Sequence, residues 1–220
     1  MANVLYVGNR NYSSWSMRPW LALTWGGIAF ETRTIPLGGE GYTQRRMPDV
    51  LAVSPAGTVP ALHVGGEVIV DSLAISEWAA ELARKLWPED AVARAHARAA
   101  ACEMHAGFGA IRASLPCNLR RRAPARTLGD DVKREVARLE ALWSTLRARF
   151  GQGGPYLFGA QPTIADAFFT PIATRFRTYQ VEVGEEATRY CEALLANEAF
   201  RAWEAEAVAE PWTMPQWDAV

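Results

Sequence analysis

Cysteine is scarce in this chain of 220 residues. The only three, Cys102, Cys117 and Cys191, are widely spaced, and no pair forms a Cys-x-x-Cys motif. An odd number of scattered cysteines excludes a disulfide framework. Because the sequence also has no Cys/His cluster, we expect neither a zinc site nor a redox-active dithiol, and we predict no metal.

The chain also lacks a strong charge of one sign. Its formal net charge is −1, so nucleic acid or an anionic membrane surface is not an expected partner. The one basic cluster, Arg120-Arg121-Arg122 with Arg126, is interpreted as a solvated helix end and loop. No apolar run approaches the length of a membrane span, and the first ten residues do not resemble a secretory signal. These absences together predict a cytoplasmic location.

The first eighty residues combine strand and helix patterns. Strands are expected at 4–7 and 28–37 and in a hairpin of 60–64 and 67–70, whose turn is Gly65-Gly66. Helices are expected at 15–25, irregularly at 41–51, and after the capping pair Asp71-Ser72. The resulting order is β-α-β, α, hairpin, α, which predicts an α/β domain over residues 1–83.

After a linker near residues 84–90, strand signals disappear. Apolar residues at helical spacing predict helices at 91–114, 131–150, 163–179 and 185–208, the last one broken near Asn197. This pattern predicts an all-α second domain over residues 91–220.

Three serines lie at the start of the first helix. Pro19 fits best in the first turn, so we expect the helix to begin near Trp15, with Ser13, Ser14 and Ser16 at its edge. Free backbone N–H groups and the positive end of the helix dipole stabilise an anion there. The alternative is that one serine only caps the helix. No histidine lies nearby to deprotonate a serine, which disfavours a hydrolase-type nucleophile.

The segment from Asn11 to Leu23 resembles the active-site segment of serine-type glutathione transferases, and it is most similar to the zeta class. Three further motifs carry the same resemblance, in the family's order: Thr58-Val59-Pro60-Ala61-Leu62, Asp71-Ser72-Leu73-Ala74-Ile75 and Pro162-Thr163-Ile164-Ala165-Asp166. The resemblance implies a thioredoxin-like first domain that binds glutathione. It also implies an all-helical domain that forms the electrophile site, a homodimer, and a role in detoxification.

The resemblance also implies roles for individual residues. Counting back from the arginine-bearing helix matches Ser13 to the family's catalytic serine. Ser13 would therefore donate a hydrogen bond to the glutathione thiolate. Ser14 is the reserve choice and Tyr12 the third. Thr58, Val59 and Pro60 would also bind glutathione, and the Val59–Pro60 peptide bond would be cis. Asp71 and Ser72 would bind the γ-glutamyl end. Thr163 and Asp166 would cap a helix and serve folding.

The second substrate is expected between the domains. Candidate residues for this subsite are Trp15, Phe108, Arg112, Cys117, Arg175 and Trp212, with core packing as the alternative for the apolar ones. Arg112 and Arg175 favour an acidic electrophile. Trp15 stands where the zeta class has cysteine, which argues against a cysteine-dependent isomerase step.

Conjugation of glutathione to small electrophiles is the leading function implied by the resemblance. The alternatives are glutathione-dependent cis–trans isomerisation of a maleylacetoacetate-like substrate, and a non-catalytic binding protein of the same fold.

Overall fold

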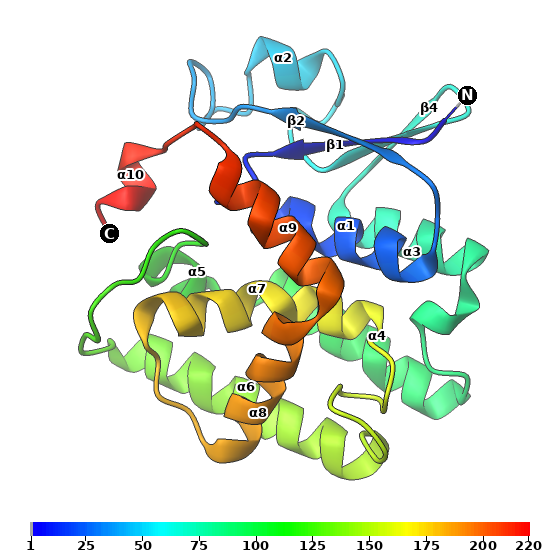
Figure 1. Cartoon of the computed structure of the whole chain (residues 1–220), viewed down its shortest axis with the longest axis vertical. Coiled ribbons are helices and arrows are strands. Elements are labelled where there is room, and N and C mark those ends of the chain that lie inside the picture. The colour runs from blue at the N-terminus through cyan, green and yellow to red at the C-terminus, as the bar shows by residue number, and fades with distance from the viewer. Residues whose placement is uncertain (1) are drawn as a thin grey trace.

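A computed structural model describes residues 2–220 of the chain. Its first part is a four-stranded mixed sheet with helices on it, drawn at the top of Figure 1. The elements are β1 (Val4–Gly8), α1 (Ser14–Gly26), β2 (Glu31–Ile35), α2 (Pro48–Leu51), β3 (Ala61–Val64), β4 (Glu67–Val70) and α3 (Ser72–Leu82). The strand order is β2-β1-β3-β4, with β1 and β2 parallel and the other pairs antiparallel.

The hairpin of β3 and β4 forms where the sequence predicts it. Val64 pairs with Glu67, so the turn consists of Gly65 and Gly66. Both glycines have positive φ, at 58° and 94°. Two-residue hairpin turns require such values and glycine adopts them without steric cost. The turn therefore sets the register that brings β3 alongside β1.

In the second part, every named element within the described residues is a helix. Its elements are the 3₁₀ turn η1 (Arg84–Leu86) and the helices α4 (Ala91–Ala106), α5 (Gly109–Ser114), α6 (Asp130–Phe150), α7 (Ile164–Tyr179), α8 (Glu185–Ala196), α9 (Glu198–Ala209) and α10 (Pro215–Asp218). The predicted fold class, an α/β domain followed by an all-α domain, is confirmed. No helix within residues 2–220 has the length and apolar character needed to cross a membrane.

Three local predictions were wrong. The helix expected over 91–114 is two helices, because Phe108 adopts a left-handed conformation with φ of 60°. The irregular helix expected over 41–51 is helical only from Pro48 to Leu51. Helix α1 begins at Ser14, so Pro19 lies beyond the first turn. There Pro19 removes only one N–H donor, the one that would have bonded the Trp15 carbonyl.

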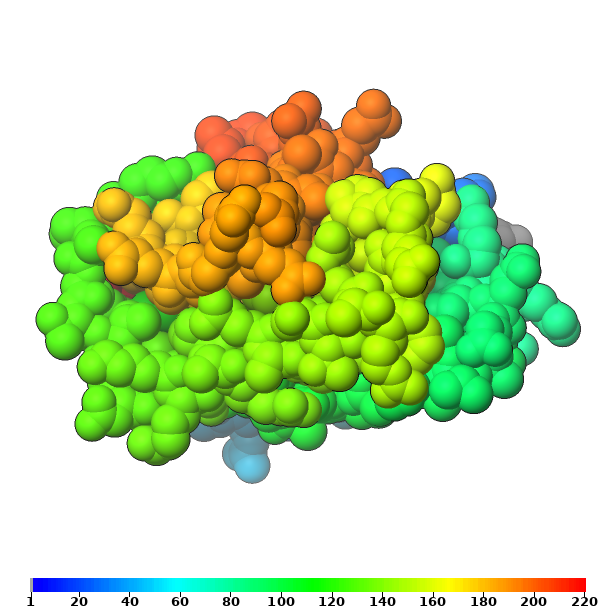
Figure 2. Space-filling model, turned by 90° about the horizontal axis from the view of Figure 1, so that it is seen from below, coloured from blue at the N-terminus to red at the C-terminus, as the bar shows by residue number. Residues whose placement is uncertain are grey.

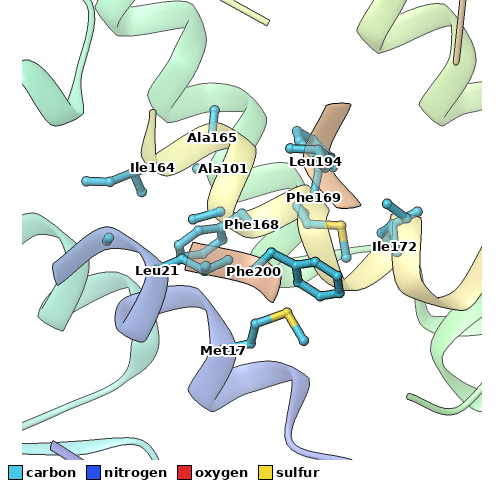
Figure 3. Close-up of a cluster of buried hydrophobic side chains, with 14 of the residues drawn as sticks. Met17, Leu21, Ala101, Ile164, Ala165, Phe168, Phe169, Ile172, Leu194 and Phe200 are labelled. Carbon is cyan, nitrogen blue, oxygen red and sulfur yellow. The ribbon is translucent and has the colours of Figure 1, made fainter. Parts of the chain in front are cut away.

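Helix α1 lies between the sheet and the helical part. Its side chains Met17 and Leu21 are fully buried and meet Phe168 of α7 and Phe200 of α9 (Figure 3). Each buried side chain of this size contributes about 1.5–3 kcal/mol relative to an exposed one. One continuous apolar cluster therefore joins both parts and fixes the start of α1 against α7.

Helix α7 is the central helix of the second part. Thr163 and Asp166 form the predicted capping box at its start. The buried Asp166 carboxylate also accepts hydrogen bonds from the Leu157 N–H at 3.1 Å and the Tyr190 hydroxyl at 2.9 Å. Helices α6 and α8 cover the face of the molecule farthest from the sheet (Figure 2).

Candidate active site

A cavity of about 460 Å³ opens at the start of α1, between the sheet-bearing part and the helical part. This volume lies within the range of small-molecule sites, about 300–1,000 Å³. The cavity is lined by Tyr12, Ser13, Ser14, Trp15, Leu37, Tyr42, Thr43, Arg45, Met47, Val50, Gly57, Thr58, Val59, Arg112, Pro116, Cys117, Arg175 and Trp217.

Ser13 is the N-cap residue of α1, yet its side chain does not cap the helix. Its hydroxyl instead donates to Ser16 Oγ at 2.7 Å, and Ser16 Oγ also accepts from the Gly8 N–H at 3.2 Å. Ser13 and Ser16 are both buried. Because Ser13 does not cap the helix and hydroxyl groups rotate, its hydroxyl can turn from Ser16 and donate to a ligand in the cavity.

Ser14 is held by a cation from the helical part. Arg175 of α7 donates to Ser14 Oγ at 3.2 Å, to the Leu115 carbonyl at 2.8 Å and to the Pro171 carbonyl at 3.0 Å. Burial lowers the pKa of Arg175. The Ser14 hydroxyl accepts from this guanidinium and can still donate its own proton.

Trp15 contacts two further cations. The guanidinium carbons of Arg18 and Arg112 lie 4.2 Å and 4.7 Å from the centre of its ring, and Arg18 also lies over Phe168 at 4.8 Å. Burial lowers the pKa of Arg112 to about 10, and Arg175 adds to this shift. Burial, together with Arg112 and Arg175, lowers the pKa of Arg18. Within residues 2–220, none of these three arginines forms an ion pair with a carboxylate.

The turn before β3 supplies a second wall. The Val59–Pro60 peptide bond is cis, as predicted. Thr58 and Val59 line the cavity, whereas Pro60 does not. Among the residues described, nothing forms a hydrogen bond with the Val59 N–H or C=O. An extended ligand can therefore pair with this backbone as an added strand would.

Asp71 and Ser72 begin α3 beyond the lining of the cavity. Asp71 has φ of 81° and ψ of 134°, values that cost a residue other than glycine of the order of 1–3 kcal/mol. Its Oδ1 accepts from the Leu73 N–H at 2.7 Å, and its Oδ2 lies 3.4 Å from His105 Nε2. The Ser72 hydroxyl is buried and has no hydrogen-bond partner. Strained backbone beside an unused buried hydroxyl is typical of a binding site.

Two residues expected at the second-substrate subsite do not line the cavity. Phe108 is 6% exposed, packs into the core and is not among the lining residues. Trp212 lies on the segment after α9, where Trp217 rather than Trp212 reaches the cavity. Trp15, Arg112, Cys117 and Arg175 do line it. The Pro at the first position of α10 was the sequence signal for the short helix that carries Trp217.

The basic cluster is only in part the solvated segment that was predicted, since Arg122 and Arg126 are exposed and the other two arginines are not. Arg120 and Arg121 are half-buried and donate to the backbone of the segment after α9. Arg120 also donates to the Tyr12 hydroxyl at 3.3 Å. Two arginines of the cluster therefore hold the end of the fold against the loop that carries Ser13.

The cavity contains one thiol. Cys117 is 4% exposed, and its Sγ lies 3.9 Å from the Thr174 hydroxyl. Burial raises the pKa of Cys117, and Arg175 opposes the shift. Within residues 2–220, no group of three His, Cys, Asp or Glu side chains is placed to hold a metal ion.

Comparison with known proteins identifies the class. The model of the glutathione S-transferase N-terminal domain matches residues 12–82, and that of the glutathione S-transferase C-terminal domain matches residues 89–206. The chain is 32% identical over 179 residues to a probable maleylacetoacetate isomerase of Caenorhabditis elegans, covering 79% of each chain. It is 30% identical over 195 residues to a maleylpyruvate isomerase of Ralstonia sp, covering 78% of this chain and 84% of the relative.

Solved structures share the fold. A glutathione transferase homologue from Burkholderia GL BGR1 with bound glutathione superposes with a TM-score of 0.72 at 22% identity, covering 96% of this chain and all of the other. A bacterial maleylpyruvate isomerase of the zeta class superposes with a TM-score of 0.66 at 24% identity, covering 94% and 98%. The chain therefore belongs to the glutathione S-transferase family, and it is an enzyme.

Proposed function

We propose that the cavity binds glutathione as a co-substrate and activates its thiol as a thiolate for attack on a small electrophile. The observation that carries this proposal is Ser13, a helix N-cap residue that lines the cavity and whose hydroxyl does not cap the helix. The thiolate, and not the thiol, is the nucleophile.

The energetics are within reach of the groups present. A free thiol ionises near pH 8.5, and lowering its pKa by about two units requires about 2.7 kcal/mol of preferential stabilisation of the anion. A hydroxyl that donates to an ion contributes about 1.5–3 kcal/mol. The N-terminus of α1 adds about 0.3–1 kcal/mol. These contributions suffice without a metal or a general base.

The remaining polar groups fit the other parts of the tripeptide. The free N–H and C=O of Val59 suit the cysteinyl backbone. The unused Ser72 hydroxyl at the start of α3 suits the γ-glutamyl carboxylate, and the Asp71 carboxylate suits the ammonium group.

The test of this proposal is glutathione binding followed by turnover. Calorimetry should show glutathione binding to the wild type, and conjugation of 1-chloro-2,4-dinitrobenzene should be lost or much reduced in Ser13→Ala. Equal turnover by wild type and Ser13→Ala would contradict the role of Ser13. Absence of glutathione binding would contradict the function itself.

A second candidate is glutathione-dependent cis–trans isomerisation of an acidic maleyl substrate. Arg112 and Arg175 line the cavity without carboxylate partners among the described residues, so the site attracts an anion. The curated relatives named above are maleyl isomerases. Assaying maleylpyruvate beside 1-chloro-2,4-dinitrobenzene separates the two activities, and the isomerase role requires turnover of maleylpyruvate at catalytic glutathione concentrations.

We further propose that the enzyme is a cytoplasmic homodimer with a role in detoxification. The support for the homodimer is membership of the glutathione S-transferase family. Light scattering should report twice the mass of the chain. A mass equal to that of one chain would contradict the proposed homodimer.

A further inference from the structure

The segment that follows α9 crosses both parts of the molecule before it ends in α10, which Figure 1 shows beyond the end of α9. Met214 anchors it and is 1% exposed. A Cβ atom on Gly38, in the loop after β2, would lie 3.5 Å from Met214 Cε, so this loop and the segment are in close contact. Glu210, at the start of the segment, accepts from the Arg10 N–H at 3.0 Å.

A polar cluster fastens α10 to the loop that carries Ser13. The Tyr12 hydroxyl lies 2.9 Å from both carboxylate oxygens of Asp218 and accepts from the Met214 N–H at 3.1 Å. The Asn118 side chain donates to Asp218 Oδ1 at 2.7 Å, and Arg120 donates to the Tyr12 hydroxyl. Asp218 thus holds α10 to residues from both parts of the chain.

Trp217, the neighbour of Asp218, is the residue of this segment that lines the cavity. It is half-buried and shares the lining of the cavity with Tyr42. Trp217 shares the lining with Ser13, Trp15 and Arg112, so it belongs to the same cavity as the hydroxyl proposed to hold the glutathione sulfur.

We propose that Trp217 is a specificity-determining residue, held by Asp218 as a wall that limits the length of the group carried on the glutathione sulfur. The inference rests on the proposed function, since it assumes that glutathione occupies the cavity. The proposal assigns selectivity among electrophiles to a residue that lies outside the segment containing Ser13, Ser14 and Ser16. The shape of an apolar pocket discriminates between substrates that differ by one methylene by about 10–200-fold. A single tryptophan that closes one end of the pocket is therefore sufficient to determine which electrophiles fit.

The test uses S-alkyl derivatives of glutathione, because these bind without requiring that the electrophile be known. Dissociation constants of S-methylglutathione and S-octylglutathione are measured by calorimetry for wild type, Trp217→Ala and Trp212→Ala. Trp212 is the matched control, since it is a half-buried tryptophan of the same segment that does not line the cavity. Trp217→Leu removes less of the side chain than Trp217→Ala does. It provides a second variant for the same measurement if Trp217→Ala does not fold.

Trp217→Ala should bind S-methylglutathione as the wild type does and should favour S-octylglutathione by about tenfold more than the wild type. Trp217→Leu should fall between the two, and Trp212→Ala should match the wild type. An equal change for both ligands in Trp217→Ala, or the same preference in Trp212→Ala, would overturn the proposal. Failure of S-methylglutathione to bind the wild type would instead overturn the proposed function, and this inference with it.

Asp218→Ala tests the anchoring. Without the carboxylate, Tyr12 and Asn118 lose their shared acceptor, so α10 is released and the preference should shift in the same direction as in Trp217→Ala. A wild-type preference in Asp218→Ala would overturn the role assigned to Asp218.

Discussion

The hydroxyl of Ser13 lies 2.7 Å from that of Ser16, and Ser16 in turn accepts the Gly8 N–H at 3.2 Å. Because hydroxyl groups rotate, Ser16 can donate to Ser13 once Ser13 turns its own proton towards a sulfur anion. The three groups then form a chain in which each donor is polarised by the one behind it. Ser16 has no access to the cavity, so its contribution reaches a ligand only through Ser13.

Ser16→Ala should therefore weaken activation of the thiol without abolishing it. Loss of one neutral hydrogen bond is worth about 0.5–1.5 kcal/mol, which corresponds to a rise of about 0.4–1.1 units in the midpoint of the pH profile of kcat/KM. The rise should be smaller than in Ser13→Ala. Ser54→Ala, which removes a buried serine hydroxyl away from the cavity, serves as the control and should leave the midpoint unchanged. A larger effect in Ser16→Ala than in Ser13→Ala would contradict the chain.

Arg175→Met should lower kcat/KM for an acidic electrophile more than for a neutral one. Removal of a charged donor costs about 1.5–3 kcal/mol, or about 10–100-fold. The ratio of the rates with maleylpyruvate and 1-chloro-2,4-dinitrobenzene measures this effect. Arg177→Met, on the same helix but paired with Glu204, is the control and should keep the ratio. Parallel losses for both substrates would contradict a role of Arg175 in recognising the acidic electrophile.

His105 should make unfolding depend on pH in mild acid. Burial lowers the pKa of His105 below its ordinary value of 6.5; Arg18 and Arg112 add to the shift, while Asp71 opposes it. The unfolded chain therefore binds a proton first as the pH falls below about 6.5, and stability declines from there to the lowered pKa of the folded state. Urea unfolding of His105→Gln should show a weaker pH dependence in that window. An unchanged slope would contradict this role of His105.

Asp166→Ala should strongly destabilise the fold. The Thr163 N–H, the Leu157 N–H and the Tyr190 hydroxyl would lose their common buried acceptor, at a cost of about 3–5 kcal/mol in the free energy of unfolding. Asp131→Ala, at the exposed start of α6, should cost only about 0.5–1 kcal/mol. Chemical denaturation measures both, and comparable losses would show that burial of Asp166 adds nothing.

The fold was predictable from the sequence where local patterns determine it. The Gly65-Gly66 turn and the Thr163 and Asp166 capping pair each depend on residues close in sequence, and both are present in the structure. The break at Phe108 has a local signal that the helix prediction passed over, since Gly107 and Gly109 flank Phe108 and Gly107 is the C-cap residue of α4.

The cavity was predictable from both parts of the chain, since Arg112, Cys117 and Arg175 of the helical part line it as expected, but the side formed by α10 was not predicted. Trp15, Thr58 and Val59 belong to motifs whose residues lie together in the chain. Trp217 lies about two hundred residues beyond Ser13, and contacts of its neighbour Asp218 with Tyr12 and Asn118 bring it there. The proline at the start of α10 indicates the short helix, but the choice of Trp217 over Trp212 as the lining residue depends on tertiary packing.

The most direct test is a pH titration of bound glutathione followed by the ultraviolet absorbance of its thiolate, for wild type, Ser13→Ala and Ser14→Ala. We predict that the pKa of the bound thiol in the wild type lies about two units below that of the free thiol. In Ser13→Ala this pKa should return most of the way to the value of the free thiol. Equal ionisation of the thiol in wild type and Ser13→Ala would contradict the claim that the Ser13 hydroxyl stabilises the sulfur anion.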